Sequence, residues 1–355
     1  MNDNITPYVR YIGADDKDLD LFESQYVVPQ GISYNSYVIT DEKIAVMDTI
    51  DQRKTEEWTV RLEEALEGRT PDYLIVQHME PDHAANIGWF AEKYPEATIV
   101  ASAKAIQMMP QFFEKVNFAG RTQTVKEGDT LCLGQHTLKF IMAPMVHWPE
   151  VMLTYEESEK ILFSADAFGK FGALCHEGEW IDEARRYYFN IVGKYGAQVQ
   201  ALLKKTAGLD IAMICPLHGP VLKENLGYYI GLYDTWSKYE PETEGVVVAY
   251  ASIHGNTAAA ARRMAEILSE KGAAEVMLID LCRDDMALAV ESAFRYSKMI
   301  VAASSYDAGV FPPMFDFLHH LQIKNFQKRR VGIIENGSWA PTAGRMMSCM
   351  LSEMK

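Results

Sequence analysis

Gln77-His-Met-Glu-Pro-Asp-His83 is the stretch that decides the fold of this chain, because it places two imidazoles and two carboxylates within six positions. The apolar run Tyr73-Leu-Ile-Val76 directly before it is typical of a short buried strand. Pro81 is expected to stop a regular helix from starting at once, which puts the four polar groups on a loop at the strand end. His83 then needs a local turn to join the others. The stretch predicts part of a metal site.

Further candidate ligands stand at the ends of later apolar segments, and they are His147, Asp166 and His218. With the first stretch they make four histidines, two aspartates and one glutamate. That is too many donors for one four-coordinate ion, but it suits two metals that share a carboxylate. A single His or Asp beside a strand is usually a capping or hydrogen-bonding group. The metal prediction therefore depends on the ordered set.

The ordered set resembles the metallo-β-lactamase fold, whose hydrolases carry His-x-His-x-Asp-His followed by separate His, Asp and His ligands. Glu80 stands where that signature has its second histidine. A hard carboxylate in place of an imidazole favours iron over zinc. The His-x-Glu-x-Asp-His form resembles the diiron site of flavodiiron proteins. By this resemblance one iron binds His78, Glu80 and His147, the other binds Asp82, His83 and His218, and Asp166 bridges them.

The other histidines do not share this pattern. His136, His176 and His254 lie in polar loop contexts, and His319-His320 lies in a helical stretch. Surface or packing roles are expected for all five.

Composition places the chain among globular proteins with room for two cores, since 48% of its 355 residues are hydrophobic and 23% are charged. No apolar stretch approaches the length of a membrane span, and Met1 is not followed by a basic and then an apolar segment. We therefore expect no membrane association and a cytoplasmic location.

The five cysteines form no Cys-x-x-Cys pair, which argues against a disulfide framework and against a fused rubredoxin centre.

Charge is unevenly distributed along the chain. After residue 245 there are 12 Lys+Arg and 11 Asp+Glu, against 22 and 38 before it, so the net charge of −15 comes from the first part. Such an acidic surface argues against nucleic acid as a partner. A partner with a basic docking face remains open.

A domain boundary is predicted at the polar segment Glu240–Gly245, which follows a helical stretch ending near Tyr239. Residues 1–244 would form the metallo-β-lactamase-like diiron domain and residues 245–355 a flavodoxin-like FMN-binding domain. Before the boundary, strands are expected at Gly31–Val38 and Lys43–Asp48, and an amphipathic helix at Thr55–Leu66.

An anion site is predicted directly after the boundary. A buried strand from Val246 leads into Ser252-Ile-His-Gly-Asn-Thr257 and then into a helix from Ala258 to Lys271. This arrangement offers backbone N–H groups and the positive end of a helix to a phosphate. Gly255 allows close backbone approach. The loop has no basic residue and lacks Gly-x-Gly-x-x-Gly, which fits a monophosphate rather than a dinucleotide.

Three more strands alternate with helices from there to the end, which predicts a doubly wound sheet with ligands outside the carboxyl ends of its strands. The two loops at those ends each hold a glycine and an aromatic suited to a flat ring. With the phosphate loop they resemble a flavodoxin domain binding FMN. The candidate FMN contacts are Ser252, Ile253, His254, Gly255, Asn256, Thr257, Ser304, Tyr306, Asp307, Gly309, Asn336, Gly337, Ser338 and Trp339.

The fold class is therefore α/β: a metallo-β-lactamase-like αββα sandwich followed by a flavodoxin-like doubly wound parallel sheet. The fifth strand and last helix of a flavodoxin unit are expected to be missing, because the chain as given stops at Lys355 after the helix that follows strand four. Strand four would then be an exposed edge.

The family resemblance implies reduction of dioxygen to water, of nitric oxide to nitrous oxide, or of both. FMN would relay electrons to two iron ions from a rubredoxin-like or other reductase donor. It also implies a head-to-tail homodimer or a dimer of dimers. Two alternatives stay open at this point. One is a zinc hydrolase with an attached redox module, and the other is an electron carrier whose metal site is vestigial.

Overall fold

The structure is a computed structural model that describes residues 4–176 and 178–354. The chain divides into two compact units. Unit 1 runs to Ala184 and includes Ala201–Ile230, while unit 2 comprises Arg185–Gln200 and the chain from Gly231 onward. The predicted boundary between residues 244 and 245 falls inside strand β16 (Thr243–Ala251). A division into folding domains at that point stays a prediction.

Unit 1 contains two main sheets. The first has the strand order β1-β6-β7-β8-β9-β10 and the second β11-β12-β13-β14-β15. The strands of the first sheet are β1 (Val9–Tyr11), β6 (Tyr37–Thr40), β7 (Ile44–Met47), β8 (Tyr73–Val76), β9 (Thr98–Ser102) and β10 (Thr122–Val125). The strands of the second sheet are β11 (Thr130–Cys132), β12 (Thr137–Met142), β13 (Met152–Glu156), β14 (Ile161–Phe163) and β15 (Met213–Cys215). Two small pairs complete the unit: β2 (Ala14–Asp16) with β5 (Ile32–Tyr34), and β3 (Leu21–Phe22) with β4 (Tyr26–Val27).

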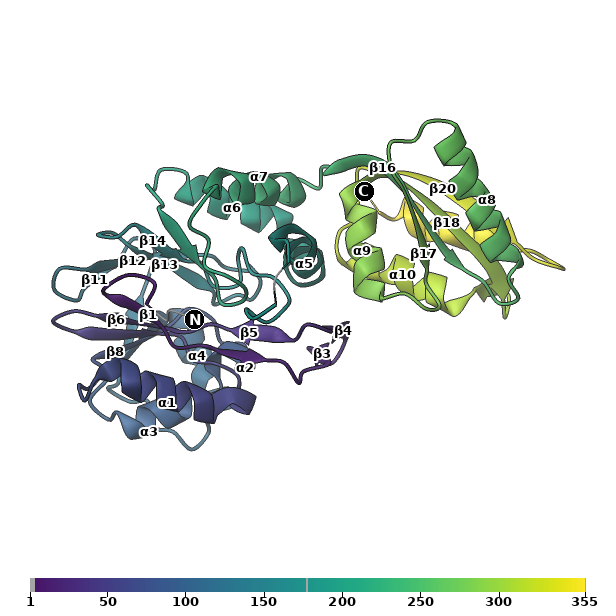
Figure 1. Cartoon of the computed structure of the whole chain (residues 1–355). Coiled ribbons are helices and arrows are strands. Elements are labelled where there is room, and N and C mark those ends of the chain that lie inside the picture. Colours follow the sequence, from purple (N-terminus) through teal and green to yellow (C-terminus); the bar gives the residue numbers. More distant parts are fainter. Residues whose placement is uncertain (1–3, 177, 355) are drawn as a thin grey trace. The chain divides into compact units, whose positions relative to one another are not determined.

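The two main sheets pack against each other around a shared apolar core. Ile75 and Val100 from the first sheet and Phe140 and Phe163 from the second belong to one buried cluster. Helices α1 (Thr55–Leu66) and α3 (Ile87–Lys93) lie on the outer side of the first sheet (Figure 1). The last turn of α6 (Gly196–Thr206) is tied to the second sheet, since Lys205 Nζ donates to the Met142 carbonyl at 2.7 Å. The predicted αββα sandwich is confirmed.

The ligand stretch differs from the sequence prediction in one respect. Pro81 does not delay a helix but begins one, because Pro81–Ala84 forms the short helix α2 with Glu80 at its N-cap. Proline is well suited to the first helical position, where its missing N–H would have no intrahelical partner. The turn that His83 needs is this helix.

Unit 2 contains a parallel sheet ordered β17-β16-β18-β20, with the short strand β19 (Gly309–Val310) folded back on the end of β18. Beside β16, these strands are β17 (Val276–Asp280), β18 (Tyr296–Tyr306) and β20 (Arg330–Asn336). Helix α8 (Asn256–Glu270) covers one face and packs Ala258 and Ala261 against Val246 and Val248. The doubly wound arrangement is confirmed, whereas β19 was not predicted.

Strand β20 is the last strand of this sheet in the described chain. Within residues 4–176 and 178–354 it pairs with β18 alone, and its Ile333 is 37% exposed. The absence of a fifth strand from the domain stays a prediction.

The remaining helices connect these strands. They are α4 (Ala103–Phe112), α5 (Trp180–Tyr187), α7 (Leu226–Ser237), α9 (Met286–Arg295), α10 (Pro312–Ile323) and α11 (Ala343–Ser352), with short η1 (Gln52–Lys54), η2 (Tyr188–Val192) and η3 (Gly193–Tyr195). Phe189 in η2 stacks on Phe294 in α9 with ring centroids 4.4 Å apart, which explains why this segment clusters with unit 2. Among the described helices, none has the length and apolar character needed to cross a membrane.

Candidate metal centre and cofactor cavity

The backbone that carries the first candidate ligands is held by Asp48, which follows β7. Its carboxylate accepts hydrogen bonds from Gln77 N at 2.7 Å and Gln77 Nε2 at 2.9 Å, and a longer one from His78 N at 3.3 Å. Burial raises the pKa of the Asp48 carboxyl to about 6 despite these donors. Asp48 thereby fixes the path of the chain as it leaves β8. Sequence reasoning missed Asp48, although it directly follows a buried strand.

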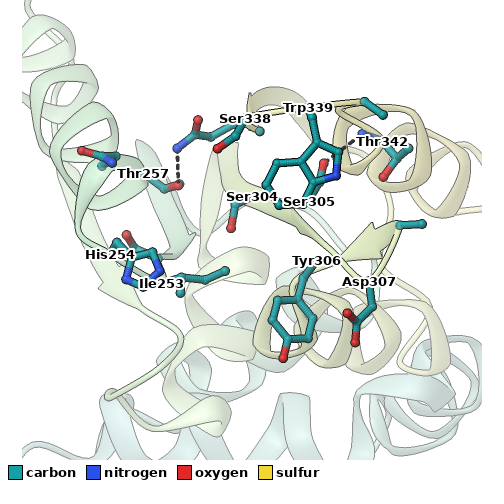
Figure 2. A pocket seen from close by; sticks show the side chains of 16 residues that line it. Ile253, His254, Thr257, Ser304, Ser305, Tyr306, Asp307, Ser338, Trp339 and Thr342 are labelled. Atoms are coloured by element: carbon teal, nitrogen blue, oxygen red, sulfur yellow. Dashed lines mark hydrogen bonds between the residues drawn. The ribbon is translucent and has the colours of Figure 1, made fainter.

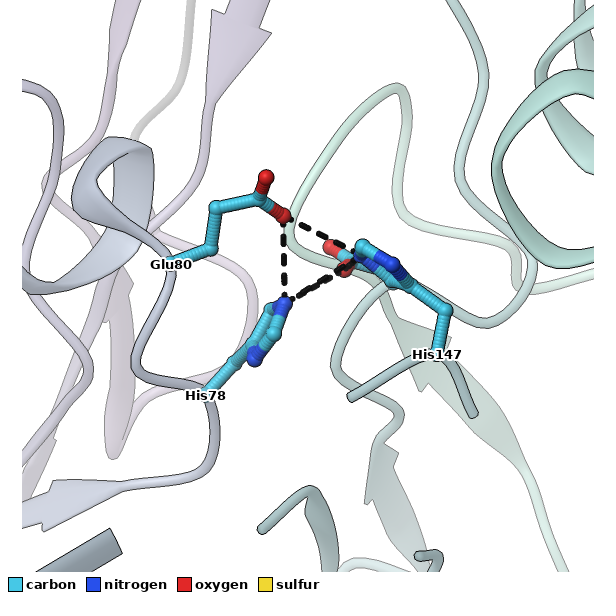
Figure 3. A group of neighbouring side chains, drawn as sticks. His78, Glu80 and His147 are labelled. Carbon is cyan, nitrogen blue, oxygen red and sulfur yellow. Dashed lines mark hydrogen bonds and ion pairs between the residues drawn. The ribbon is translucent and has the colours of Figure 1, made fainter. Parts of the chain in front are cut away.

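The first group of donors is His78, Glu80, His147 and Asp166. His78 Nε2 lies 3.3 Å from both Glu80 Oε2 and His147 Nε2, and His147 Nε2 lies 3.1 Å from Glu80 Oε2 (Figure 3). Asp166 Oδ2 lies 3.2 Å from His78 Nε2 and 3.0 Å from His147 Nε2. Four donors from three separate parts of the chain thus converge on one point.

The second group is Asp82, His83 and His218. His83 Nε2 lies 3.1 Å from His218 Nε2, and Asp82 Oδ2 lies 3.3 Å and 3.2 Å from these two nitrogens. Asp166 reaches this group with its other oxygen, Oδ1, which lies 3.2 Å from His83 Nε2 and 3.8 Å from His218 Nε2. Asp166 therefore faces both groups, as a bridging carboxylate would.

The donor set fits two metal cations. All four oxygens of Asp82 and Asp166 are buried without a hydrogen-bond partner, which is costly unless a positive charge lies between them. Burial by itself would lower the pKa of the His147 imidazole, but Asp166 and Glu80 outweigh it and raise that pKa to about 9. The cluster therefore stabilises positive charge at its centre. Within the described chain, these two groups are the sets of three or more such donors close enough to hold a metal.

Neighbouring groups orient the imidazoles. His78 Nδ1 lies 2.8 Å from Glu150 Oε1, which also accepts from Met79 N at 2.9 Å. His218 Nδ1 lies 2.7 Å from the Ser33 carbonyl. Such partners fix the ring tautomer and turn Nε2 toward a metal. Glu150 follows His147 by three positions in the sequence, but the sequence pattern did not reveal its role.

Apolar rings enclose the two groups. Phe22 in β3 lies edge-on to the His218 ring at 5.5 Å, and Trp148 lies edge-on to the His78 ring at 5.3 Å. Because Phe22 is buried, the β3–β4 hairpin covers one side of the donor cluster. These rings cover the His78 and His218 side chains, which have no exposed surface, whereas 14% of the Glu80 side chain is exposed.

Other histidines have other partners. His136 is buried with its Nδ1 2.8 Å from Asp41 Oδ2, and His320 lies 3.7 Å from Asp316 within α10. Neither belongs to the two donor groups of the described chain, and the surface or packing roles expected for them stay a prediction.

A cavity of about 520 Å³ opens in unit 2 at the carboxyl ends of the parallel strands. Its wall combines the loop after β16, the end of β18 and the loop after β20. Figure 2 shows His254 and Thr257 on one side and Tyr306 and Trp339 across from them. Asn336 Nδ2 donates to Thr257 Oγ1 at 3.2 Å and so joins two of the loops. The predicted strand-end loops thus line a cavity, and their contact with a cofactor stays a prediction.

Twelve of the fourteen predicted contacts line this cavity, and Gly255 and Gly309 do not appear in its wall. Gly255 has a φ of +88°, and nothing lies within 4 Å of the position that a Cβ would take there, so a ligand can approach its backbone. Sequence reasoning missed four wall residues from the same loops, namely Ser305, Ala308, Ala340 and Thr342. Ser305 Oγ accepts from Thr342 N at 2.8 Å, a contact that only the folded loops create.

The cavity suits a flat ring that carries a phosphate. Trp339 is 83% exposed and Tyr306 45% exposed, so both rings are free to stack on a ligand. The N-terminus of α8 begins at Asn256 in the cavity wall and favours an anion. No lysine or arginine lines the cavity in the described chain, which leaves the phosphate to backbone N–H groups and polar side chains.

Comparisons with known proteins agree with the sandwich and its site. The sequence model of the ODP family of beta lactamases matches residues 32–219, which assigns this part of the chain to that class. The chain is 29% identical over 353 residues to the anaerobic nitric oxide reductase flavorubredoxin of Aliivibrio fischeri, covering 96% of this chain and 70% of the relative. It is 31% identical to an uncharacterized protein of Methanocaldococcus jannaschii, covering 88% and 80% respectively.

Solved structures extend the likeness to both units. The flavodiiron protein of Giardia intestinalis matches with a TM-score of 0.93 at 25% identity, covering 99% of this chain and 88% of that one. Rubredoxin oxygen:oxidoreductase of Desulfovibrio gigas matches with a TM-score of 0.92 at 25% identity, covering 98% and 89%. The chain belongs to the flavodiiron protein family, a family of oxidoreductases, and the predicted resemblance is confirmed.

Proposed function

We propose that the chain is a flavodiiron oxidoreductase that reduces dioxygen to water, nitric oxide to nitrous oxide, or both, with electrons relayed by FMN to two irons. The observation that carries the proposal is the convergence of seven metal donors in two groups that share Asp166. The names of two similar proteins, a nitric oxide reductase and an oxygen oxidoreductase, support these two substrates.

The donor geometry supports a definite ligand assignment. We assign His78, Glu80 and His147 to one iron, Asp82, His83 and His218 to the other, and Asp166 to both. When bound, two such irons supply electrons together to a small diatomic molecule. The protein's own part would be to hold both irons through Asp166, to orient the imidazoles through Glu150 and Ser33, and to cover His78 and His218 with the rings of Trp148 and Phe22.

Glu80 distinguishes this proposal from a zinc hydrolase. Its Oε2 lies 3.1 Å from His147 Nε2, so a carboxylate oxygen takes the place that the hydrolase signature gives to an imidazole. An oxygen-rich set favours iron over zinc. The oxidoreductase names of the relatives also favour the diiron alternative over the hydrolase.

The cavity in unit 2 supports FMN as the second cofactor. The phosphate would be held by Ser252, Asn256 and Thr257 at the start of α8, and the isoalloxazine ring would lie against Tyr306 and Trp339. FMN supplies one-electron and two-electron redox chemistry when bound. The chain's part is to bind the phosphate without a lysine or arginine and to leave the ring edge accessible.

Partners follow from this proposal. A rubredoxin-like protein or another reductase would donate electrons to FMN, as the name of the Desulfovibrio gigas protein suggests. The cavity and the metal donors lie in different units of the chain. We propose a head-to-tail homodimer, alone or as a dimer of dimers, in which one subunit's FMN serves the other's irons. The expected cytoplasmic location stays a prediction.

Metal and flavin analysis of the purified protein, followed by anaerobic turnover with each gas, tests the proposal. We expect about two irons and one FMN per chain, and consumption of nitric oxide, dioxygen or both with a chemically reduced donor. Stoichiometric zinc with negligible iron, after expression with iron available, would contradict the diiron assignment.

A further inference from the structure

A second cavity in unit 2 lies at the opposite ends of the strands from the FMN cavity. It has a volume of about 600 Å³ and is lined by residues at the beginnings of β16, β18 and β20. Its charged and hydroxyl-bearing residues are Glu244, Ser297, Lys298, Lys328, Arg329 and Arg330, which we call the basic pocket. Four cations therefore face one carboxylate, on a chain whose net charge is −15.

The only carboxylate among the described residues of the pocket wall, that of Glu244, already accepts hydrogen bonds from two neighbouring residues. Glu244 Oε2 accepts hydrogen bonds from Ser297 Oγ at 2.8 Å and from Lys298 Nζ at 3.1 Å. These two donors, Ser297 first and then Lys298, lower the pKa of the Glu244 carboxyl. Glu244 therefore balances Lys298 and leaves the three consecutive cations from Lys328 to Arg330 without a matching negative charge.

Two of these three cations are satisfied only by neutral carbonyl oxygens. Lys328 Nζ donates to the Lys238 carbonyl at 2.8 Å, and Arg329 donates to the Tyr239 carbonyl at 2.7 Å and to the Phe294 carbonyl. Arg329 Nε is buried without a hydrogen-bond partner, and burial lowers the pKa of this guanidinium to about 10. A charged group removed from water is normally paired with an opposite charge, and Arg329, whose Nε is buried, pairs with no carboxylate in the described chain. An anion bound in the pocket would supply that pairing.

The third cation, Arg330, is available to bind an anion in the pocket. Arg330 is exposed at the start of β20, and no ion pair in the described chain joins Lys328, Arg329 or Arg330 to a carboxylate. Guanidinium groups present several N–H donors in one plane and bind phosphate oxygens in pairs, while lysine adds a mobile point charge. The pocket has room for more than a single phosphate group.

We propose that the basic pocket binds a small anion that carries a diphosphate group. Free inorganic diphosphate and the diphosphate of a nucleotide share this chemistry. The pocket wall contains no aromatic side chain on which a base could stack. The base should therefore add little, and both ligands should bind with similar affinity. This site is separate from the FMN cavity, whose wall has no lysine or arginine.

Isothermal titration calorimetry on the FMN- and metal-loaded 355-residue protein tests this, with inorganic diphosphate and ADP as separate ligands at constant ionic strength. We expect saturable binding of one diphosphate per chain and an ADP affinity within about threefold of it. Iron is measured before and after each titration, so that chelation is told apart from binding. The measurement needs no turnover and is independent of the proposed reaction.

Three substitutions test whether the residues of the basic pocket determine the affinity for diphosphate. Arg330→Gln should weaken diphosphate binding about threefold to tenfold, because it removes a charge-assisted donor. Glu244→Gln should strengthen binding, because it releases Lys298 from its carboxylate. Lys271→Gln removes an exposed positive charge from the end of α8, outside the pocket wall, and should leave the affinity unchanged. No saturable binding, or an equal loss in Lys271→Gln and Arg330→Gln, would overturn the proposal.

Discussion

Glu150 and His78 form a fully buried pair in which the carboxylate Oε1 lies 2.8 Å from the imidazole Nδ1. The same oxygen accepts from Met79 N, so the pair is attached to the backbone of the ligand stretch. Burial raises the pKa of the Glu150 carboxyl, but the neighbouring His78 outweighs it and leaves that pKa below its usual value. Glu150 is therefore an ionised partner that directs His78 Nε2 toward the metal.

Glu150→Ala should lower the iron affinity of the centre by about tenfold to a hundredfold, the effect typical of losing such a partner. Glu150→Gln keeps an acceptor oxygen and should restore part of the affinity. Competition with a chromogenic chelator measures both variants. Iron binding in Glu150→Ala as tight as in the parent protein would show that the pair does not orient the ligand.

Glu80→His tests which residue selects the metal. The change recreates the imidazole of the hydrolase signature and should shift the metal content toward zinc. Gas reduction should then fall to background, because zinc has no accessible redox change. Metal analysis and turnover are measured on the same preparation. Full reductase activity in this variant would show that Glu80 does not select the chemistry.

The metal donors were predictable because each stands where an apolar strand gives way to a polar group, and because their order matches a known signature. The structure brings all seven together, although residues as far apart as His83 and His218 must meet. Pro81 was misjudged because the same residue that interrupts a helix interior is favoured at its first position.

The supporting residues could not be predicted in the same way. Asp48 and Glu150 are carboxylates among the 49 acidic residues of the chain. Asp48 does follow a buried strand, but its sequence position does not show that it would bind the backbone at His78. Their roles arise from contacts between separate strands. Likewise, Ser305 and Thr342 meet only because the loops after β18 and β20 adjoin. Sequence pattern predicts where a strand ends, whereas tertiary structure decides which ends share a site.

Asn256→Asp tests the phosphate loop. The change removes a donor and places a negative charge at the start of α8, so FMN binding should weaken by about 1–3 kcal/mol. Asn256→Ser keeps a donor without adding charge and serves as the control. Fluorescence titration of the flavin-free protein with FMN gives both dissociation constants. Equal affinity in the parent and Asn256→Asp would remove this loop from the phosphate site.

Removal of the metals should destabilise the protein. The oxygens of Asp82 and Asp166 are buried without a hydrogen-bond partner, so without metal cations only neighbouring imidazoles that take up a proton, such as His147, can compensate their charge. A ligand present at about 100 times its dissociation constant stabilises the native state by about 2.7 kcal/mol, which chelation would abolish. Calorimetric unfolding before and after chelation, followed by addition of ferrous iron, measures the effect. An unchanged melting temperature would contradict metal binding by this cluster.

Trp339 provides a direct optical test of flavin binding, because its indole ring is 83% exposed in the wall of the cavity. Stacking of a flavin on this ring should quench its fluorescence and cover it. Trp339→Phe should keep most of the affinity for FMN, but the part of the fluorescence quenching that comes from the Trp339 indole should disappear. Trp339→Ala should weaken FMN binding by about 1 kcal/mol. Phe311, which packs on Tyr306 outside the cavity wall, offers Phe311→Leu as a control for general damage to the loops. If FMN quenches the parent protein and Trp339→Phe to the same extent, Trp339 does not contact the flavin.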